Sequence, residues 1–198
     1  MTSRLAHRQS NESTFPQKVG NTGYVLSMIV LRLPVLADMD QVLTWRNSPE
    51  VAPYMYRDDP IPAHEHAKWF PTTTTDSPTA RYRVAEFNGT SVGWTSLTRI
   101  DPRNRSCEWG GYLAPSAPRS SGIGRLVLES SLRMAFAEMN MNRIVVEVLV
   151  GNDRALRLYE SIGFRREGLL RERAWQTSGP QDAIALSMLA AEWTPDNI

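Results

Sequence analysis

The sequence predicts an α/β domain built around a mixed β-sheet. Residues 80–114 contain three strand-like runs separated by short turns, which is typical of an antiparallel meander. The run 143–150, "RIVVEVLV", is β-branched and apolar on both faces except at Glu147, as in a central strand. Apolar residues recur at helical spacing in 122–139 and in 152–162 on either side of that run. Strands that alternate with helices in this way indicate one layered α/β unit.

The remaining elements follow from local signals. "MIVLRL" reads as a first strand, and the apolar spacing after it suits a short helix. Asn152 can cap the last helix and Gly163 can end it. "TSGPQ" joins the final two strands as a hairpin. The expected strands are 28–33, 80–87, 91–100, 106–114, 143–150, 164–176 and 182–189, and the expected helices are 37–45, 62–70, 122–139 and 152–162.

Length and composition favour a single domain in a reducing compartment. The chain has 198 residues, of which 41% are hydrophobic. Its net charge of +1 favours neither nucleic acid nor an anionic membrane as a partner, and no apolar run is long enough to span a bilayer. The single cysteine, Cys107, fits a cytoplasmic location. Residues 1–27 are polar and aperiodic, so we expect a loose tail before a domain at 28–198; the alternative is a segment docked on the domain.

The stretch "RSSGIG", 119–124, places flexible residues at the start of a predicted helix. A helix N-terminus carries unpaired N–H groups and a partial positive charge, which suit a phosphate. Glycine lets the backbone approach a pyrophosphate closely, and Arg119 adds a fixed charge. The alternative is an ordinary loop-to-helix junction capped by serine.

The flanking residues decide between these interpretations. Arg119, Gly122 and Gly124 match the Arg/Gln-x-x-Gly-x-Gly/Ala pattern, while Asn152 and Tyr159 follow the fifth expected strand, before "ESIGF". From about Met28 to Trp193 the chain therefore resembles the GNAT superfamily of acetyl-CoA-dependent N-acetyltransferases. The resemblance implies the GNAT fold, in which helices flank a mixed sheet of about seven strands whose strands four and five splay apart. It also implies an enzyme with acetyl-CoA as co-substrate.

The resemblance further implies roles for individual residues. The pantetheine arm pairs with strand backbone near Leu113, whose N–H is a candidate for the oxyanion donor. Tyr159 is the candidate general acid for the leaving thiolate; the alternative is a core aromatic on an amphipathic helix. The residues expected to bind acetyl-CoA are Tyr112, Leu113, Ala114, Arg119, Ser120, Ser121, Gly122, Ile123, Gly124 and Asn152.

The base that deprotonates the attacking amine stays open at this point. Glu108 and Ser96 are the candidates, each acting directly or through water, against a salt-bridged glutamate and a half-buried serine. Glu147 on the central strand is either a carboxylate with a raised pKa or the partner of an arginine. His64 and His66 would point in different directions on a helix, so no metal site is expected.

The acceptor site is expected in 45–70. This segment is similar to the N-acetyltransferases of the pseudaminic acid pathway, which acetylate a UDP-linked amino sugar, although the long tail and the Thr-rich loop at 72–75 depart from them. The resemblance implies a nucleotide-linked amino sugar, with cations for its diphosphate and an apolar shelf for its uracil. The candidate residues are Arg46, Asn47, Met55, Tyr56, His66 and Trp69.

Other activities compete with this interpretation. A Rim-type acetyltransferase of protein N-termini or ribosomal proteins shares text similar to "GYLAP" and "ALRLYESIGF". A drug-amine acetyltransferase and a non-catalytic acetyl-CoA sensor are further alternatives. The presence of Tyr159 beside the loop at 119–124 speaks against a sensor. The partner expected is a small-molecule amine, with a homodimer as a possibility.

Overall fold

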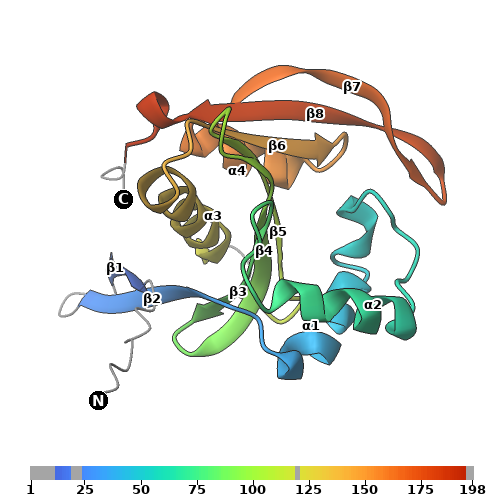
Figure 1. Cartoon of the computed structure of the whole chain (residues 1–198), viewed down its shortest axis with the longest axis horizontal. Helices are drawn as coiled ribbons and strands as arrows, with labels where there is room; N and C mark the ends of the chain where they lie inside the picture. Colours follow the sequence, from blue (N-terminus) through green and yellow to red (C-terminus); the bar gives the residue numbers. More distant parts are fainter. Residues whose placement is uncertain (1–11, 19–23, 119–120, 195–198) are drawn as a thin grey trace, which may run out of the picture.

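One mixed sheet forms the frame of the molecule, with strand order β1-β2-β3-β4-β5-β6-β8-β7 (Figure 1). The computed structural model describes residues 12–18, 24–118 and 121–194. The strands are β1 (Glu12–Lys18), β2 (Tyr24–Arg32), β3 (Arg81–Phe87), β4 (Thr90–Asp101), β5 (Ser106–Leu113), β6 (Arg143–Leu149), β7 (Arg165–Gln176) and β8 (Gly179–Leu189). The helices are α1 (Met39–Arg46), α2 (Ala63–Trp69), α3 (Ile123–Arg133) and α4 (Asp153–Ile162). None of the described helices is long and apolar enough to cross a membrane.

The seven strands expected from the sequence are all present, and β1 is additional. Strand β1 pairs with β2 along its whole length, from Glu12↔Val30 to Lys18↔Tyr24. It lies in the stretch that the sequence predicts to be a loose tail. No strand is predicted there because a polar segment without alternating apolar residues carries no local strand signal. Pairing of β2 with β3 begins only at Ile29↔Phe87. The domain boundary at residue 28 stays a prediction.

The parallel contact between β5 and β6 is short. It comprises three residue pairs, Ser106↔Arg143, Cys107↔Ile144 and Glu108↔Val145. Beyond Glu108, β5 pairs only with β4, while β6 continues beside β8 as far as Leu149↔Ala183. The fourth and fifth of the expected strands therefore separate after three pairs, and one edge of each faces the gap.

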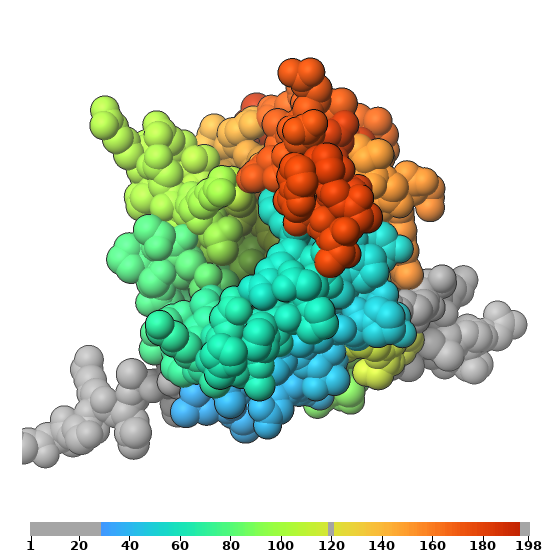
Figure 2. Space-filling model, turned by 90° about the vertical axis from the view of Figure 1, so that its right-hand side faces the viewer, coloured from blue at the N-terminus to red at the C-terminus, as the bar shows by residue number. Residues whose placement is uncertain are grey.

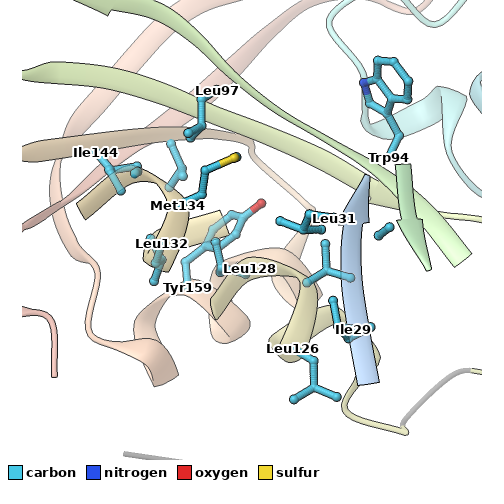
Figure 3. Packing of buried hydrophobic residues seen from close by; sticks show 14 of the residues in the cluster. Ile29, Leu31, Trp94, Leu97, Leu126, Leu128, Leu132, Met134, Ile144 and Tyr159 are labelled. Atoms are coloured by element: carbon cyan, nitrogen blue, oxygen red, sulfur yellow. The ribbon is translucent and has the colours of Figure 1, made fainter. Parts of the chain in front are cut away.

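Different layers cover the two faces of the sheet. On one face, Thr95 of β4 contacts Ser131 of α3 through their hydroxyl groups, 3.0 Å apart. The preceding residue, Trp94, points to the opposite face and packs against Phe70, at 6.0 Å between ring centroids. Figure 3 shows Leu128 and Leu132 of α3 with Tyr159 in the core on the first face. The helical stretch expected at 122–139 is divided: α3 ends at Arg133 and a wider π-helical turn, Met134–Glu138, follows it.

Candidate active site

A cavity of about 660 Å³ lies where β5 and β6 separate. Its lining comes from β5, from the starts of α3 and α4, and from the segment at 49–55. The lining residues are Pro49, Glu50, Val51, Tyr54, Met55, Trp109, Gly111, Tyr112, Leu113, Pro118, Ser121, Gly122, Ile123, Gly124, Arg125, Val127, Asn152, Arg154, Ala155, Leu158 and Tyr159. The cavity therefore joins the glycine-containing loop to the segment expected to bind the acceptor.

The loop before α3 forms one end of the cavity. Gly122 is the N-cap of α3 with φ +82°, a left-handed conformation that favours glycine, and no side chain caps this helix. The first-turn N–H groups are thus available to a ligand. Arg125 and Arg154 also line the cavity. Neither was predicted from the sequence, although a basic residue in the first turn of each helix was a usable signal. Arg119 and Ser120 lie outside the described residues. This end suits an anion such as a pyrophosphate.

The backbone of β5 offers donors to the gap. The N–H of Ala114 donates to the carbonyl of Val92 at 2.8 Å, so this N–H points toward β4. Successive N–H groups of a strand point to opposite sides, so the N–H of Leu113 faces the gap that β6 leaves open. Tyr112 and Leu113 both line the cavity, whereas Ala114 does not. Of the three predicted strand residues, Leu113 is therefore placed to pair with a ligand through its N–H.

Tyr159 and Asn152 reach the cavity from α4. The Asn152 side chain accepts a hydrogen bond from the N–H of Ala155 at 3.2 Å and so caps the helix. Tyr159 is buried, with its ring 5.7 Å from that of Trp109 and 5.8 Å from that of Phe164. Burial raises the pKa of Tyr159, so its phenol keeps its proton at neutral pH. The structure gives Tyr159 the protonation state that a general acid needs.

The candidate bases lie outside the cavity lining. Glu108 forms an ion pair with Arg99 at 2.9 Å. The hydroxyl of Ser96 donates to the carbonyl of Gly110 at 3.4 Å. Glu147 accepts hydrogen bonds from the hydroxyl of Tyr56 and from Nε of Arg173, the latter at 2.7 Å. Glu147 is therefore paired with an arginine, as one of the two interpretations of the sequence expects.

The residues predicted to bind the acceptor are only partly brought together. Met55 lines the cavity, and Tyr56 follows it, with its ring 4.9 Å from the guanidinium of Arg173. Asn47 bonds both the N–H and the carbonyl of Ile61, each at 2.9 Å, and so closes a loop.

Of the six predicted acceptor residues only Met55 lines the cavity, so Arg46, His66 and Trp69 lie outside the lining, as Asn47 and Tyr56 do. Arg46 donates to the carbonyl of Arg57, and its Nη1 is buried without a partner. His66 is buried against Trp69 and Phe70, and burial lowers its pKa, so its imidazole is neutral at pH 7.

Part of the acceptor end of the cavity was not predicted from the sequence. Pro49, Glu50, Val51 and Tyr54 line the cavity there. Glu50 was recognisable as a carboxylate within the expected segment, but its orientation depends on the turn that follows α1. Within the described residues no group of three His, Cys, Asp or Glu side chains could hold a metal ion.

The sequence matches the acetyltransferase (GNAT) domain family over residues 29–165. The chain belongs to the GNAT family. It is therefore an N-acetyltransferase that uses acetyl-CoA, and its sheet has the GNAT arrangement in which the strands labelled β5 and β6 here are the splayed pair. The start of α3, which no side chain caps, and the N–H of Leu113, which faces the gap, fit this co-substrate.

Relatives of several activities resemble the chain. The spermidine N(1)-acetyltransferase of Vibrio cholerae is 24% identical over 84% of this chain and 96% of its own length. PseH of Campylobacter jejuni is 24% identical over 64% of this chain and 76% of its own length. The putative ribosomal N-acetyltransferase YdaF of Bacillus subtilis is 30% identical, over 54% of this chain and 58% of that relative. The crystal structure of the Vibrio cholerae spermidine enzyme with CoA and spermine has a TM-score of 0.76 at 25% identity, covering 83% and 96% of the two chains.

Proposed function

We propose that this GNAT enzyme acetylates a primary amine of a small molecule that carries further positive charge, such as a polyamine. One observation carries the proposal: the two ends of the cavity differ in charge. Among the described lining residues, Arg125 and Arg154 lie at the end formed by α3 and α4, where Arg125 is ion-paired with Glu129 at 2.8 Å, and the only carboxylate, Glu50, lies at the acceptor end. The cationic end suits the phosphates of acetyl-CoA, and the carboxylate suits an ammonium group.

Two further glutamates lie near Tyr56 of the acceptor segment, but each is ion-paired. Glu147 accepts a hydrogen bond from the hydroxyl of Tyr56, and burial, Glu147 and, more weakly, Glu108 raise the pKa of this phenol. Glu108 is partnered by Arg99, and Glu147 by Arg173. Those two ion pairs are neutral overall, whereas Glu50 brings a negative charge to the cavity lining. The similarity to the Vibrio cholerae spermidine N(1)-acetyltransferase, which covers most of both chains, supports an acceptor of this class.

The transfer proceeds by direct attack in a ternary complex. The neutral amine nitrogen bonds to the thioester carbon, the carbon–sulfur bond breaks, and Tyr159 gives its proton to the leaving sulfur. The proton that the new amide nitrogen loses passes through water and restores the phenol of Tyr159. The strand N–H near Leu113 stabilises the negative charge on the carbonyl oxygen. The ammonium loses its proton before attack to Glu108, through water because Glu108 does not line the cavity; the hydroxyl of Ser96, also outside the lining, can relay this proton but not keep it.

A nucleotide-linked amino sugar is the second candidate acceptor. Tyr56 and Trp69 are 37% and 39% exposed, so each ring offers a face to a uracil, and the similarity to PseH favours this class. The diphosphate would need a cation at the acceptor end. Arg46 and His66 both lie outside the cavity lining, so neither offers that charge to a ligand there in this conformation.

Initial rates with a panel of amines test the acceptor. We expect acetyl-CoA consumption with spermidine to exceed that with UDP-linked 4-amino sugars and with N-terminal peptides. Glu50→Gln should raise the spermidine KM about fivefold, near 1 kcal/mol, and leave the acetyl-CoA KM unchanged. Glu160→Gln is the control, because Glu160 pairs with Arg166 outside the cavity lining. Faster turnover of the sugar nucleotide, or a Glu50 variant that behaves like the control, would refute the polyamine class.

A further inference from the structure

Trp109 places a buried hydrogen-bond donor at the cavity without a partner. Its ring lines the cavity, and its Nε1 is inaccessible to solvent and bonds to no protein atom. A buried donor without an acceptor destabilises the fold, so native proteins seldom keep one unless something else satisfies it. The roles considered so far for Tyr159, Asn152 and the strand N–H groups do not use it.

The ring of Trp109 is held in place by its neighbours. Gly111 leaves room for it: a Cβ at that position would lie 2.9 Å from Cζ2 of Trp109 and 2.9 Å from the carbonyl oxygen of Trp94. The ring also meets the Tyr159 ring edge to face, at 5.7 Å and 78°. Such a fixed ring loses little entropy when its N–H binds a ligand.

The position of Trp109 along the sheet indicates which part of a ligand it meets. Glu108 is the last β5 residue that pairs with β6, so Trp109 is the first residue of the separated part. Tyr159, which we propose protonates the sulfur, contacts the Trp109 ring. The carbonyl oxygen of a thioester is two bonds from that sulfur, so a thioester whose sulfur meets Tyr159 also brings this oxygen near the Trp109 ring.

We propose that the indole N–H of Trp109 donates a hydrogen bond to the thioester carbonyl oxygen of acetyl-CoA. The bond strengthens as that oxygen gains negative charge during attack, so Trp109 supplements the backbone N–H near Leu113. This inference rests on the proposed function through the position of Tyr159. It makes Trp109 a catalytic residue that also distinguishes acetyl-CoA from CoA, because CoA has no thioester oxygen.

Binding of the two ligands to Trp109→Phe tests the proposal without an acceptor amine. Isothermal titration should show acetyl-CoA affinity about fivefold to tenfold weaker than in the unsubstituted protein, and CoA affinity unchanged. Trp175→Phe is the matched control, because Trp175 is 75% exposed on β7 and outside the cavity lining. Equal losses for both ligands would place the bond on the pantetheine arm, and no loss would remove Trp109 from binding. Either result overturns the assignment to the thioester.

The unsubstituted protein provides a second measurement, which holds even if Trp109→Phe fails to fold. The chain has six tryptophans, so a ¹⁵N-labelled sample gives at most six indole N–H signals. One of them should move to lower field with acetyl-CoA but not with CoA. Identical indole spectra in the two complexes would overturn the proposal. Neither measurement depends on turnover, so a failure here is distinct from a failure of Tyr159 as the acid.

Discussion

At the scale of single residues, burial decides how Tyr159 can act. Its phenol lies in the core, and its ring contacts those of Trp109 and Phe164. A folded-state pKa raised above the usual tyrosine value of about 10 means that the proton stays bound as the pH rises. A group in this state is able to give a proton at neutral pH but not to take one.

Tyr159→Phe should lower kcat about a hundredfold and leave acetyl-CoA affinity nearly unchanged. The change removes the hydroxyl and keeps the ring packing. Because the pKa is raised, kcat of the unsubstituted enzyme should show no decline assignable to this phenol between about pH 7 and pH 9. Rates are compared under conditions where chemistry limits turnover. A Phe variant with at least half of the original kcat would exclude Tyr159 from the mechanism.

Cys107 should be inert in the folded protein. It is buried on β5, and burial, with a smaller effect of Glu108, raises the pKa of its thiol to about 12. The thiolate fraction near pH 8 is then about a thousandfold below that of an ordinary cysteine. We expect a thiol-disulfide reagent to label the protein slowly in buffer and rapidly in urea. Fast labelling without denaturant would contradict the buried position.

At the scale of elements, the β7–β8 hairpin supports the acceptor segment. The Gln176 side chain donates to the carbonyls of Pro53 and Met55, at 3.0 Å and 2.7 Å. Thr177 bonds Asp58 through its N–H, at 2.9 Å, and through its hydroxyl. Figure 2 shows the red tip of the hairpin lying against the cyan segment, beside a recess in the surface. The last strands of the chain therefore help to shape the far end of the cavity.

Gln176→Ala should raise the KM for the acceptor several-fold and leave that for acetyl-CoA unchanged. Each hydrogen bond that the substitution removes contributes about 1 kcal/mol to holding residues 53–55 in place. Gln181→Ala is the control, since the Gln181 side chain bonds only Ser178 and the carbonyl of Gly179 within the hairpin. Equal effects of the two substitutions on the acceptor KM would show that the contact with 53–55 has no role in binding.

The sequence predicted the elements better than the acceptor site. Period-2 and period-3.6 patterns are local, so the strands from β2 to β8 and the four helices were recognisable. Gly122 and Asn152 were recognisable for the same reason, because capping chemistry depends on adjacent residues. The directions in which the His66 and Glu50 side chains point could not be recognised in this way. The packing of α2 against α1 decides the first and the turn after α1 decides the second. Strand β1 obtains its hydrogen bonds from β2, which its own sequence does not reveal.

At the scale of the whole molecule, removal of residues 1–27 should leave a folded and active enzyme. The cut removes β1 and the first residues of β2, whereas the ladder between β2 and β3 starts at Ile29 and is kept. Circular dichroism and kcat/KM of residues 28–198 check this expectation. Loss of the folding transition would show that β1 is part of the domain rather than an accessory strand.

Acetyl-CoA should stabilise the whole domain. Ligand at about a hundred times its Kd adds roughly 2.7 kcal/mol to the free energy of unfolding. For a chain of this length that corresponds to a rise in Tm of about 5–10 °C. Differential scanning calorimetry with and without acetyl-CoA measures the shift. An unchanged Tm at saturating ligand would contradict binding across the gap between β5 and β6.

The short contact between β5 and β6 leaves the sheet incomplete, because the two strands separate soon after they begin to pair. Three residue pairs hold the two halves of the sheet together there, and the remaining edge of β5 offers backbone groups to whatever enters. An extended amide-containing chain in that gap takes the place of a missing strand. The substrate is then a temporary part of the fold, and each release of CoA reopens a seam in the sheet. Amide hydrogen exchange at the β5 N–H groups that face the gap should therefore be slower with acetyl-CoA bound than in the free protein. The difference should disappear when the ligand is removed.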